Sequence, residues 1–158
     1  MTARLEIGPV TRSDARRFVA KHHSHHKAHI GETLAIGGYV SGSLVAVCVM
    51  ARPVAPALDD GRTWEVTRLC VGPNAPKFAA SRLLGAATKA ATAIGIRRLV
   101  SYTRCDESGT CYKAANWTQA ATVKGDSHTH GNRANRWLPG LYEPSTEIVD
   151  RIRWEYVR

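Results

Sequence analysis

The sequence predicts an α/β (α+β) fold in which a single mixed, mostly antiparallel sheet is flanked by helices. Two-residue and three- to four-residue apolar periods alternate in the order strand, helix, two to three strands, helix, strand, helix, strand. The 158 residues, 44% of them hydrophobic, are enough to bury one core. Neither an internal repeat nor a low-complexity segment divides the chain, so we expect residues 1–158 to form one domain.

The N-terminal half is predicted to place one helix between strands. Thr11 or Ser13 is suited to cap this helix, because a side-chain oxygen there accepts hydrogen bonds from free backbone N–H groups. Gly31 is expected to end it. The turn sequence Ser41-Gly42-Ser43 predicts a hairpin between the two strands that follow. The expected elements are strands at residues 5–10, 33–40 and 44–52 and a loop at residues 53–61.

The next strand, at residues 64–71, follows a two-residue alternation. This pattern places Glu65 and Leu69 on one face and Val66 and Arg68 on the other. The two faces therefore differ in the chemistry they present.

A long helix is expected to follow, with Asn74 and Pro76 at its start and Gly95 at its left-handed end. Its predicted apolar stripe consists of Ala79, Leu83, Ala86, Ala87, Ala90 and Ile94. The remaining expected elements are a strand at 97–103, a helix at 107–116, a strand at 117–123, a loop at 124–140, and a closing strand at 148–157 with Ile152, Trp154 and Tyr156 on one side.

Charge distinguishes the central part of the chain. The net charge is +9 and the pI is near 9.8, which favours a polyanionic partner or an anionic substrate. No acidic residue lies between Glu65 and Asp106. A solvated basic face is the alternative explanation. The basic residues in this interval are Arg68, Lys77, Arg82, Lys89, Arg97, Arg98 and Arg104.

Other compositional features predict a cytoplasmic protein. No apolar run approaches the roughly 20 residues that span a bilayer, and the N-terminus lacks the apolar core of a signal peptide. Cys48, Cys70, Cys105 and Cys111 form no Cys-x-x-Cys pair, so we expect reduced, buried thiols, with a disulfide or a zinc site as alternatives.

Histidines are concentrated at the end of the first predicted helix, where positions 22–26 hold four of the seven. His22 and His26 fall in line with the apolar stripe, and an imidazole buried without a partner costs roughly 1–3 kcal/mol. Such a pair could bind a divalent metal, iron or zinc, with Glu65 or another carboxylate as third ligand. Acid–base chemistry, substrate contact and structural hydrogen bonding are the alternatives.

Residues 65–125 resemble the acyltransferase fold of the GNAT superfamily. The resemblance rests on the sequences Arg-Leu-Cys-Val-Gly-Pro at 68–73, Ser-Arg-Leu-Leu at 81–84 and Cys-Tyr-Lys-Ala-Ala-Asn-Trp at 111–117. It implies that one strand splays from its neighbour, that the ligand enters the gap, and that a helix N-terminus receives the pyrophosphate of coenzyme A. The cofactor contacts it implies are Leu69, Val71, Lys77, Ala80, Ser81 and Arg82.

The pyrophosphate loop departs from the family pattern. Ala75 stands where the family has glutamine or arginine, and Phe78 stands where it has glycine; Ala80 does fit. A phenylalanine ring is expected to obstruct the approach of phosphate to the backbone. The departure disfavours coenzyme A as the donor.

A narrower resemblance, over residues 18–125, is to the Mom-type DNA-modification proteins of bacteriophages and related phage GNAT-like proteins. It is carried by His22 and His25, by Glu-Val-Thr-Arg-Leu at 65–69, by Val-Ser-Tyr at 100–102, and by residues 109–117. Mom proteins place a carbamoylmethyl-type group on the amino nitrogen of adenine in DNA. The resemblance therefore implies modification of an exocyclic amine of a DNA base.

The resemblances imply roles for several residues. Glu65 would act as general base, with a salt bridge to Arg68 or Arg62 as the alternative. Ser101 would orient a ligand and Tyr112 would protonate the leaving group, with a buried, merely satisfied hydroxyl as the alternative for the tyrosine. The candidate catalytic residues are His22, His25, Glu65, Ser101 and Tyr112.

Basic and aromatic residues also predict contacts with nucleic acid. Arginines can hold phosphates and a tryptophan can stack on a base, and a solvated loop is the alternative for residues 128–137. Reaching an exocyclic amine in a duplex requires base flipping or a single strand. The candidate nucleic-acid contacts are Arg68, Arg104, Arg133, Arg136 and Trp137.

Three functions follow in order of preference. The first is a GNAT-fold transferase of phage or prophage type that modifies a DNA base. The second is a coenzyme A-dependent N-acetyltransferase acting on a small amine or a protein, and the third is an inactive DNA-binding or inhibitor protein. We expect DNA as substrate, no membrane partner and a homodimer.

Overall fold

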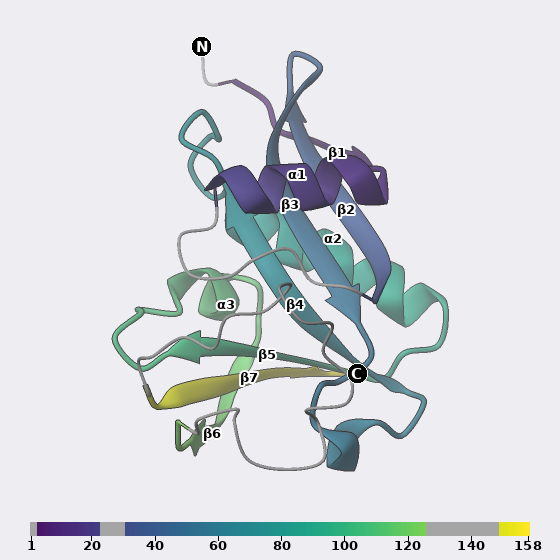
Figure 1. The fold of residues 1–158 in the computed structure, drawn as a ribbon, viewed down its shortest axis with the longest axis vertical. Helices are drawn as coiled ribbons and strands as arrows, with labels where there is room; N and C mark the ends of the chain where they lie inside the picture. Colours follow the sequence, from purple (N-terminus) through teal and green to yellow (C-terminus); the bar gives the residue numbers. More distant parts are fainter. Residues whose placement is uncertain (1–2, 23–30, 126–148) are drawn as a thin grey trace, which may run out of the picture.

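A computed structural model describes residues 3–22, 31–125 and 149–158 of the chain, and it confirms the mixed, mostly antiparallel sheet with helices on both faces (Figure 1). In the described residues the sheet has seven strands in the order β1-β2-β3-β4-β5-β7-β6. The elements are β1 (Glu6–Pro9), α1 (Arg12–His22), β2 (Glu32–Val40), β3 (Ser43–Ala51), the short 3₁₀ helix η1 (Pro56–Leu58), β4 (Thr63–Val71), α2 (Ala79–Ala93), β5 (Arg98–Arg104), α3 (Thr110–Ala114), β6 (Thr118–Val123) and β7 (Arg151–Val157).

The two central strands separate partway along their length. β4 and β5 form the parallel pair of the sheet, and the other neighbouring strands run antiparallel. Their pairing joins Thr63–Val66 to Arg98–Ser101 and goes no further, although β4 continues to Val71 and β5 to Arg104. The unpaired halves diverge and leave a gap in the sheet.

The helices cover different parts of the two faces. Figure 1 shows α1 crossing β2, β3 and β4 in front, with α2 behind the sheet. The main core lies on the α2 side, where α3 also packs against α2. A smaller cluster joins α1 to the other face and consists of Ala15, Phe18, Val19, Val47, Val49 and Cys70.

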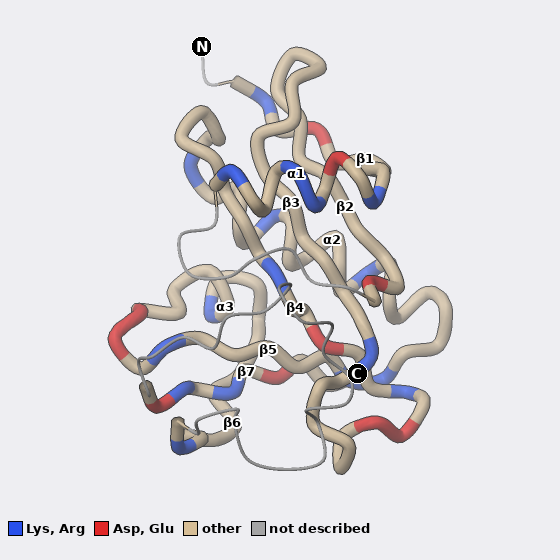
Figure 2. The backbone as a smooth tube through the Cα atoms, viewed as in Figure 1, with Lys and Arg blue, Asp and Glu red and all other residues tan. Residues whose placement is uncertain are grey.

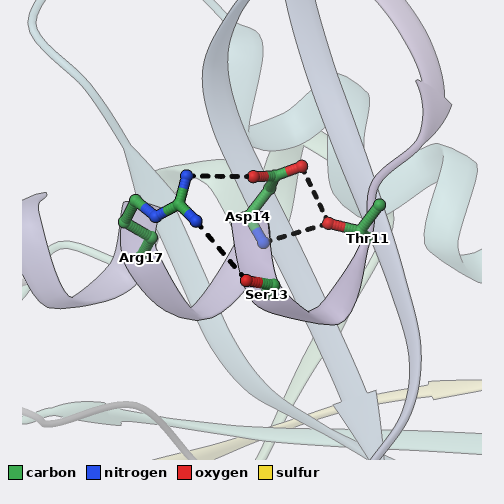
Figure 3. Close-up of polar contacts among 4 residues, drawn as sticks. All are labelled: Thr11, Ser13, Asp14 and Arg17. Atoms are coloured by element: carbon green, nitrogen blue, oxygen red, sulfur yellow. Dashed lines mark hydrogen bonds and ion pairs between the residues drawn. The ribbon is translucent and has the colours of Figure 1, made fainter.

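Polar contacts fix the start of α1 and attach its middle to β2. The Thr11 hydroxyl accepts a hydrogen bond from the Asp14 backbone N–H at 3.1 Å and donates one to the Asp14 carboxylate at 2.8 Å (Figure 3). Thr11 is therefore the cap, while the Ser13 hydroxyl accepts from Arg17 at 3.5 Å. In the middle of the helix, Arg16 forms a bidentate ion pair with Glu32 of β2.

A β-bulge in β4 changes the faces predicted for this strand. Val49 of β3 pairs with Arg68, but the next residue, Met50, pairs with Val66, so Thr67 is extra. The prediction is correct up to Val66 and wrong beyond it. Leu69 packs with Val66 against the α2-side core, and Arg68 lies on the same face as Glu65.

α2 starts later than predicted. It begins at Ala79, so Asn74 and Pro76 lie in the preceding loop, and Phe78 at the cap has a left-handed φ of 68°. Its end is as predicted, because Gly95 has a φ of 96° and its N–H bonds to the Thr92 carbonyl at 3.1 Å.

The apolar stripe predicted for α2 is partly wrong. Ile94 is 64% exposed, because the helix ends at Ala93 and the chain turns away from the core there. Leu84 and Ala91 are fully buried instead.

The other predicted strands are present with shifted ends, and α3 is shorter than the predicted helix at 107–116. The first helix beyond His22 and the predicted loop beyond residue 125 lie outside the described residues. All four cysteines are free thiols, as expected. Cys48 and Cys70 are buried as predicted, but Cys105 is exposed, because it lies just after the end of β5. Among the described residues, no helix has both the length and the apolar character needed to cross a membrane.

Candidate active site

The gap between β4 and β5 opens into a cavity of about 710 Å³. Its walls are residues 65–69 of β4, residues 101–104 of β5, residues 107–112 at the start of α3, and Val149 and Arg151. Side chains of β4 and β5 alternate between the two faces of the sheet, so the cavity has an α2-side wall and an α1-side wall. Their chemistry differs.

The α2-side wall holds a hydrogen-bonded serine and tyrosine. The Ser101 hydroxyl lies 2.7 Å from the Tyr112 hydroxyl and donates to the Val66 carbonyl at 3.1 Å. Either hydroxyl can be the donor in the bond between Ser101 and Tyr112. Tyr112 is buried, and its ring stacks on Trp154 at 5.5 Å and meets Trp117 edge-on at 5.4 Å.

Burial raises the pKa of Tyr112 far above its usual value, although the hydrogen bond with Ser101 works in the opposite direction. The hydroxyl is therefore protonated at neutral pH. A neutral hydroxyl in a fixed ring is a proton donor held in one position.

A glycine allows Trp154 to lie against Tyr112. Gly109 caps α3 with a φ of 61°, and a Cβ atom there would lie 2.2 Å from Cζ2 of Trp154. A side chain at Gly109 would thus displace the indole. The indole N–H donates to the Thr103 hydroxyl at 2.9 Å, which also holds the ring in place.

The α1-side wall holds a buried carboxylate. Glu65 is 7% exposed, and its Oε2 accepts a hydrogen bond from the Val54 backbone N–H at 2.9 Å. Burial raises the pKa of Glu65, while the Val54 bond and the charges of Arg68 and Arg151 act against that rise. A carboxyl with a raised pKa is a stronger base once ionised than an exposed glutamate.

Tyr102 lies beside Glu65 on this wall. Ser101 and Tyr102 are consecutive in β5, so their side chains lie on opposite faces. Burial raises the pKa of Tyr102, as does the nearby negative charge of Glu65, while Arg153 acts against that rise. Tyr102 is therefore a neutral, half-buried ring at the edge of the cavity.

Several residues predicted from sequence line this one cavity. Glu65, Ser101 and Tyr112 do so, as do Arg68 and Arg104, which were predicted to contact nucleic acid. Of the six predicted cofactor contacts, all of them described by the structure, Leu69 lines the cavity and the other five do not. Those five are Val71, Lys77, Ala80, Ser81 and Arg82.

The predicted histidine site remains a prediction. His22 is half-buried at the end of α1, with its ring 4.4 Å from that of Phe18, and it is not among the residues lining the cavity. Within the described residues, no three His, Cys, Asp or Glu side chains are grouped so that they could hold a metal ion. Five other predicted site residues lie outside the described part of the chain, namely His25, His26, Arg133, Arg136 and Trp137.

Tyr102, Arg151 and Gly109 line the cavity but were given no role from the sequence, although Tyr102 stands in the quoted Val-Ser-Tyr motif and patterns pointing to Tyr102 and Arg151 were present. The alternation in β5 places Tyr102 opposite Ser101, and the alternation of Ile152 with Trp154 in β7 places Arg151 on the other face. No sequence pattern indicated Gly109, because only the position of the Trp154 indole excludes a side chain there.

The residues at the start of α2 occupy the position of the coenzyme A pyrophosphate loop in the GNAT pattern. The backbone at Phe78 has the left-handed conformation that glycine favours, yet its side chain is 65% exposed with the Lys77 ammonium 5.1 Å from the ring. Arg82 donates to the Leu5 carbonyl at 3.1 Å. Phe78 therefore does not fit the close pyrophosphate contact of the GNAT pattern.

Comparison with known proteins agrees with this architecture. The structure is similar to a Bacillus subtilis acetyltransferase in complex with CoA, with a TM-score of 0.65 and 14% identity over 99% of each chain. It is also similar to the ribosomal-protein-S18-alanine N-acetyltransferase of Escherichia coli, with a TM-score of 0.68 and 12% identity over 98% of this chain and 94% of that one.

A third similar structure is an acetyltransferase of the GNAT family from Streptococcus pneumoniae, with a TM-score of 0.65 and 14% identity over 98% of this chain and 100% of that one. At these identities the likeness shows the fold. No curated protein matches the sequence. The family model of the Mom protein family matches residues 4–136.

Proposed function

The chain belongs to the Mom protein family, and from this membership and the cavity we propose that it is a GNAT-fold transferase that modifies an exocyclic amine of a DNA base. One observation carries the proposal. A buried carboxylate, Glu65, and a buried phenol, Tyr112, line the same cavity between two diverging strands. Group transfer to an amine needs a proton acceptor and a proton donor at one place.

Glu65 is the proton acceptor. An exocyclic amine of a base is neutral but a weak nucleophile, so its proton is removed as the nitrogen attacks an electrophilic carbon. The Val54 N–H holds Oε2 of Glu65, which leaves the other carboxylate oxygen for the proton. The new bond joins the base nitrogen to the transferred group, and the N–H proton ends on Glu65.

Tyr112 is the proton donor. Its hydroxyl gives its proton to the leaving atom of the donor, which departs with the electron pair of the broken bond. A coenzyme A thioester, when bound, would supply an activated acyl carbon, and the residues of the gap that would hold its arm are 67–69 and 102–104. Ser101 orients the Tyr112 hydroxyl before transfer.

The pH dependence follows from the raised pKa of Glu65. The carboxyl accepts a proton only when ionised, so the rate of modification rises as pH rises through that pKa. The rise is expected above pH 4.5, the ordinary value for glutamate, and Glu65→Gln removes it.

The decisive experiment is co-expression with a plasmid, followed by mass spectrometry of the plasmid nucleosides. We expect a mass-shifted nucleoside with the wild-type chain and about a 100-fold or greater loss with Glu65→Gln. Glu6→Gln is the matched control, because Glu6 is exposed on β1, outside the cavity. Unmodified nucleosides from soluble, folded wild-type protein would contradict the proposal.

A second candidate is a coenzyme A-dependent N-acetyltransferase for a small amine or a protein. The observation that favours it is the left-handed backbone at Phe78, a conformation that glycine favours, at the position where the GNAT pattern has glycine. Calorimetric titration with acetyl-CoA separates the two candidates. Binding at micromolar affinity with unmodified plasmid nucleosides favours the acetyltransferase.

A further inference from the structure

The α1-side wall of the cavity continues onto the same face of β5 and β7. α1 packs against β2, β3 and β4, and Figure 1 shows the front of β5 and β7 below it. Figure 2 shows lysine and arginine positions on β5 and β7 in this region, with aspartate and glutamate positions among them. Charged residues of both signs therefore adjoin the carboxylate of Glu65.

The strand register identifies the side chains on this face. Tyr102 pairs with Arg153, and Arg104 pairs with Arg151, across β5 and β7. Directly paired residues of antiparallel strands share a face, and Tyr102 shares that of Glu65. An aromatic ring and several guanidinium groups thus surround the general base.

The ion pairs on this face are unevenly distributed. Glu155 binds both Arg98 and Arg153, with 2.9 Å between Arg153 Nε and Glu155 Oε1. Arg104 is held by Asp106 at 3.0 Å. Arg151 forms no ion pair with any residue in the described part of the chain, and it lines the cavity.

Tyr102 and Arg151 thus offer two different contacts at the mouth of the cavity. An aromatic side chain stacks on any nucleobase, and an arginine that forms no ion pair within the described residues is suited to a phosphate. Both contacts can be made by one nucleotide only when its base is unpaired, because a paired base is stacked between its neighbours inside the duplex.

We propose that the α1-side wall binds one unpaired nucleotide, with its base stacked on Tyr102 and its phosphate on Arg151, so that the exocyclic amine faces Glu65. The inference rests on the proposed function and specifies its substrate as a single-stranded or flipped-out nucleotide. Tyr102 and Arg151 are positioning residues in this arrangement, and the proton transfers remain with Glu65 and Tyr112.

The test measures the binding of a fluorescein-labelled single-stranded oligodeoxynucleotide by anisotropy, with no turnover required. Tyr102→Leu is expected to weaken binding about 5- to 150-fold, the range for loss of one base–aromatic stack. Tyr102→Phe keeps the ring and is expected to bind within about twofold of wild type. Equal affinities for the leucine and phenylalanine variants would overturn the stacking assignment.

Salt dependence tests the phosphate contact. Arg151→Gln is expected to reduce the slope of log K against log salt by about 0.7, the value for one lost phosphate contact with a single strand. Arg97→Gln is the matched control, because Arg97 is exposed before β5 and does not line the cavity. Equal slopes for these two variants would overturn the phosphate assignment.

A readout on the wild-type chain avoids any effect of substitution on folding. A strand that carries 5-iodouracil is irradiated in the complex, and the crosslinked peptide is mapped by mass spectrometry. We expect the crosslink at Tyr102, and crosslinks that miss this residue would overturn the stack. If nucleosides stay unmodified while these binding results hold, the proposed function fails and the nucleotide site stands.

Discussion

The two faces of the sheet hold their parts of the cavity by different means. On the α2 side, Tyr112 is fixed between Trp117 and Trp154 within the main apolar core. On the α1 side, Glu65 is surrounded by guanidinium groups, and α1 rests on a smaller apolar cluster with a bidentate ion pair to Glu32. The first face is organised by shape and the second by charge.

This difference predicts how each face responds to substitution. Close-packed rings transmit a change of one atom, because no void is available to absorb it. Charged contacts respond to pH and salt and tolerate changes of shape. Substitutions on the α2 side are therefore expected to depend on size, and those on the α1 side to depend on charge.

The largest expected effect comes from Tyr112→Phe on the packed face. The ring is kept, so Trp154 and Trp117 stay in place, and Ser101 still donates to the Val66 carbonyl. Loss of the proton donor is expected to lower nucleoside modification about 100-fold or more. Tyr156→Phe is the control, because Tyr156 packs against the same core and lies outside the cavity lining. Equal activity of the two variants would assign Tyr112 a packing role.

Next in size is the effect of Gly109→Ala on stability. The new Cβ would lie 2.2 Å from Cζ2 of Trp154, and φ at this residue is 61°. Overpacking and left-handed strain together are expected to lower the free energy of unfolding by about 3 kcal/mol. Urea denaturation measures this loss.

The control for that substitution is Gly85→Ala in α2, where a Cβ meets nothing within 4 Å. Alanine is the better helix former, so this variant is expected to gain about 0.5–1 kcal/mol. If both glycine variants shift stability in the same direction, the packed face is less size-sensitive than we infer.

The packed face was also the more predictable from sequence. Ser101 and Tyr112 were identified from short motifs, and the structure brings them within 2.7 Å of each other. The apolar period of a strand or helix reports which residues are buried, which is why the order of elements was correct. Ile94 was misplaced because the exact end of a helix decides whether its last apolar residue reaches the core.

The charged face was less predictable. Glu65 and Arg68 share a face only because Thr67 bulges, and a bulge depends on the register between β3 and β4. Periodicity within one strand contains no information on that register. Arg151 was missed for a similar reason, since its place beside Glu65 requires β7 to pair with β5.

On the charged face, Arg16→Ala is expected to have a moderate effect. Arg16 Nε lies 2.8 Å from Glu32, whose side chain is 3% exposed, so truncation leaves a buried carboxylate without its partner. The expected loss is about 2 kcal/mol of unfolding free energy. Arg17→Ala is the control, since the Arg17–Asp14 pair is exposed at both ends and is expected to contribute under about 0.5 kcal/mol.

The Arg16 effect is also expected to depend on pH. Burial raises the pKa of Glu32, but hydrogen bonds and the charges of Arg16 and Arg12 outweigh burial and hold it below 4.5. A depressed pKa stabilises the fold above pH 4.5 and loses that contribution as pH falls through the folded-state value. The stability difference between wild type and Arg16→Ala should therefore shrink in acid. A difference that stays constant with pH would show that Arg16 acts through packing.

The smallest predicted effect is that of Thr11→Ala at the start of α1. Alanine removes the oxygen that accepts the Asp14 N–H and donates to its carboxylate, and the expected loss is about 1 kcal/mol (Figure 3). Thr11→Ser keeps the hydroxyl and should restore most of the stability, whereas Ser13→Ala, which removes one long contact to Arg17, should change it by under about 0.5 kcal/mol. Thermal unfolding of the three variants ranks these contacts. The cap matters because few apolar side chains hold α1 to the sheet. Equal stabilities of the alanine variants at Thr11 and Ser13 would show that packing fixes the start of the helix.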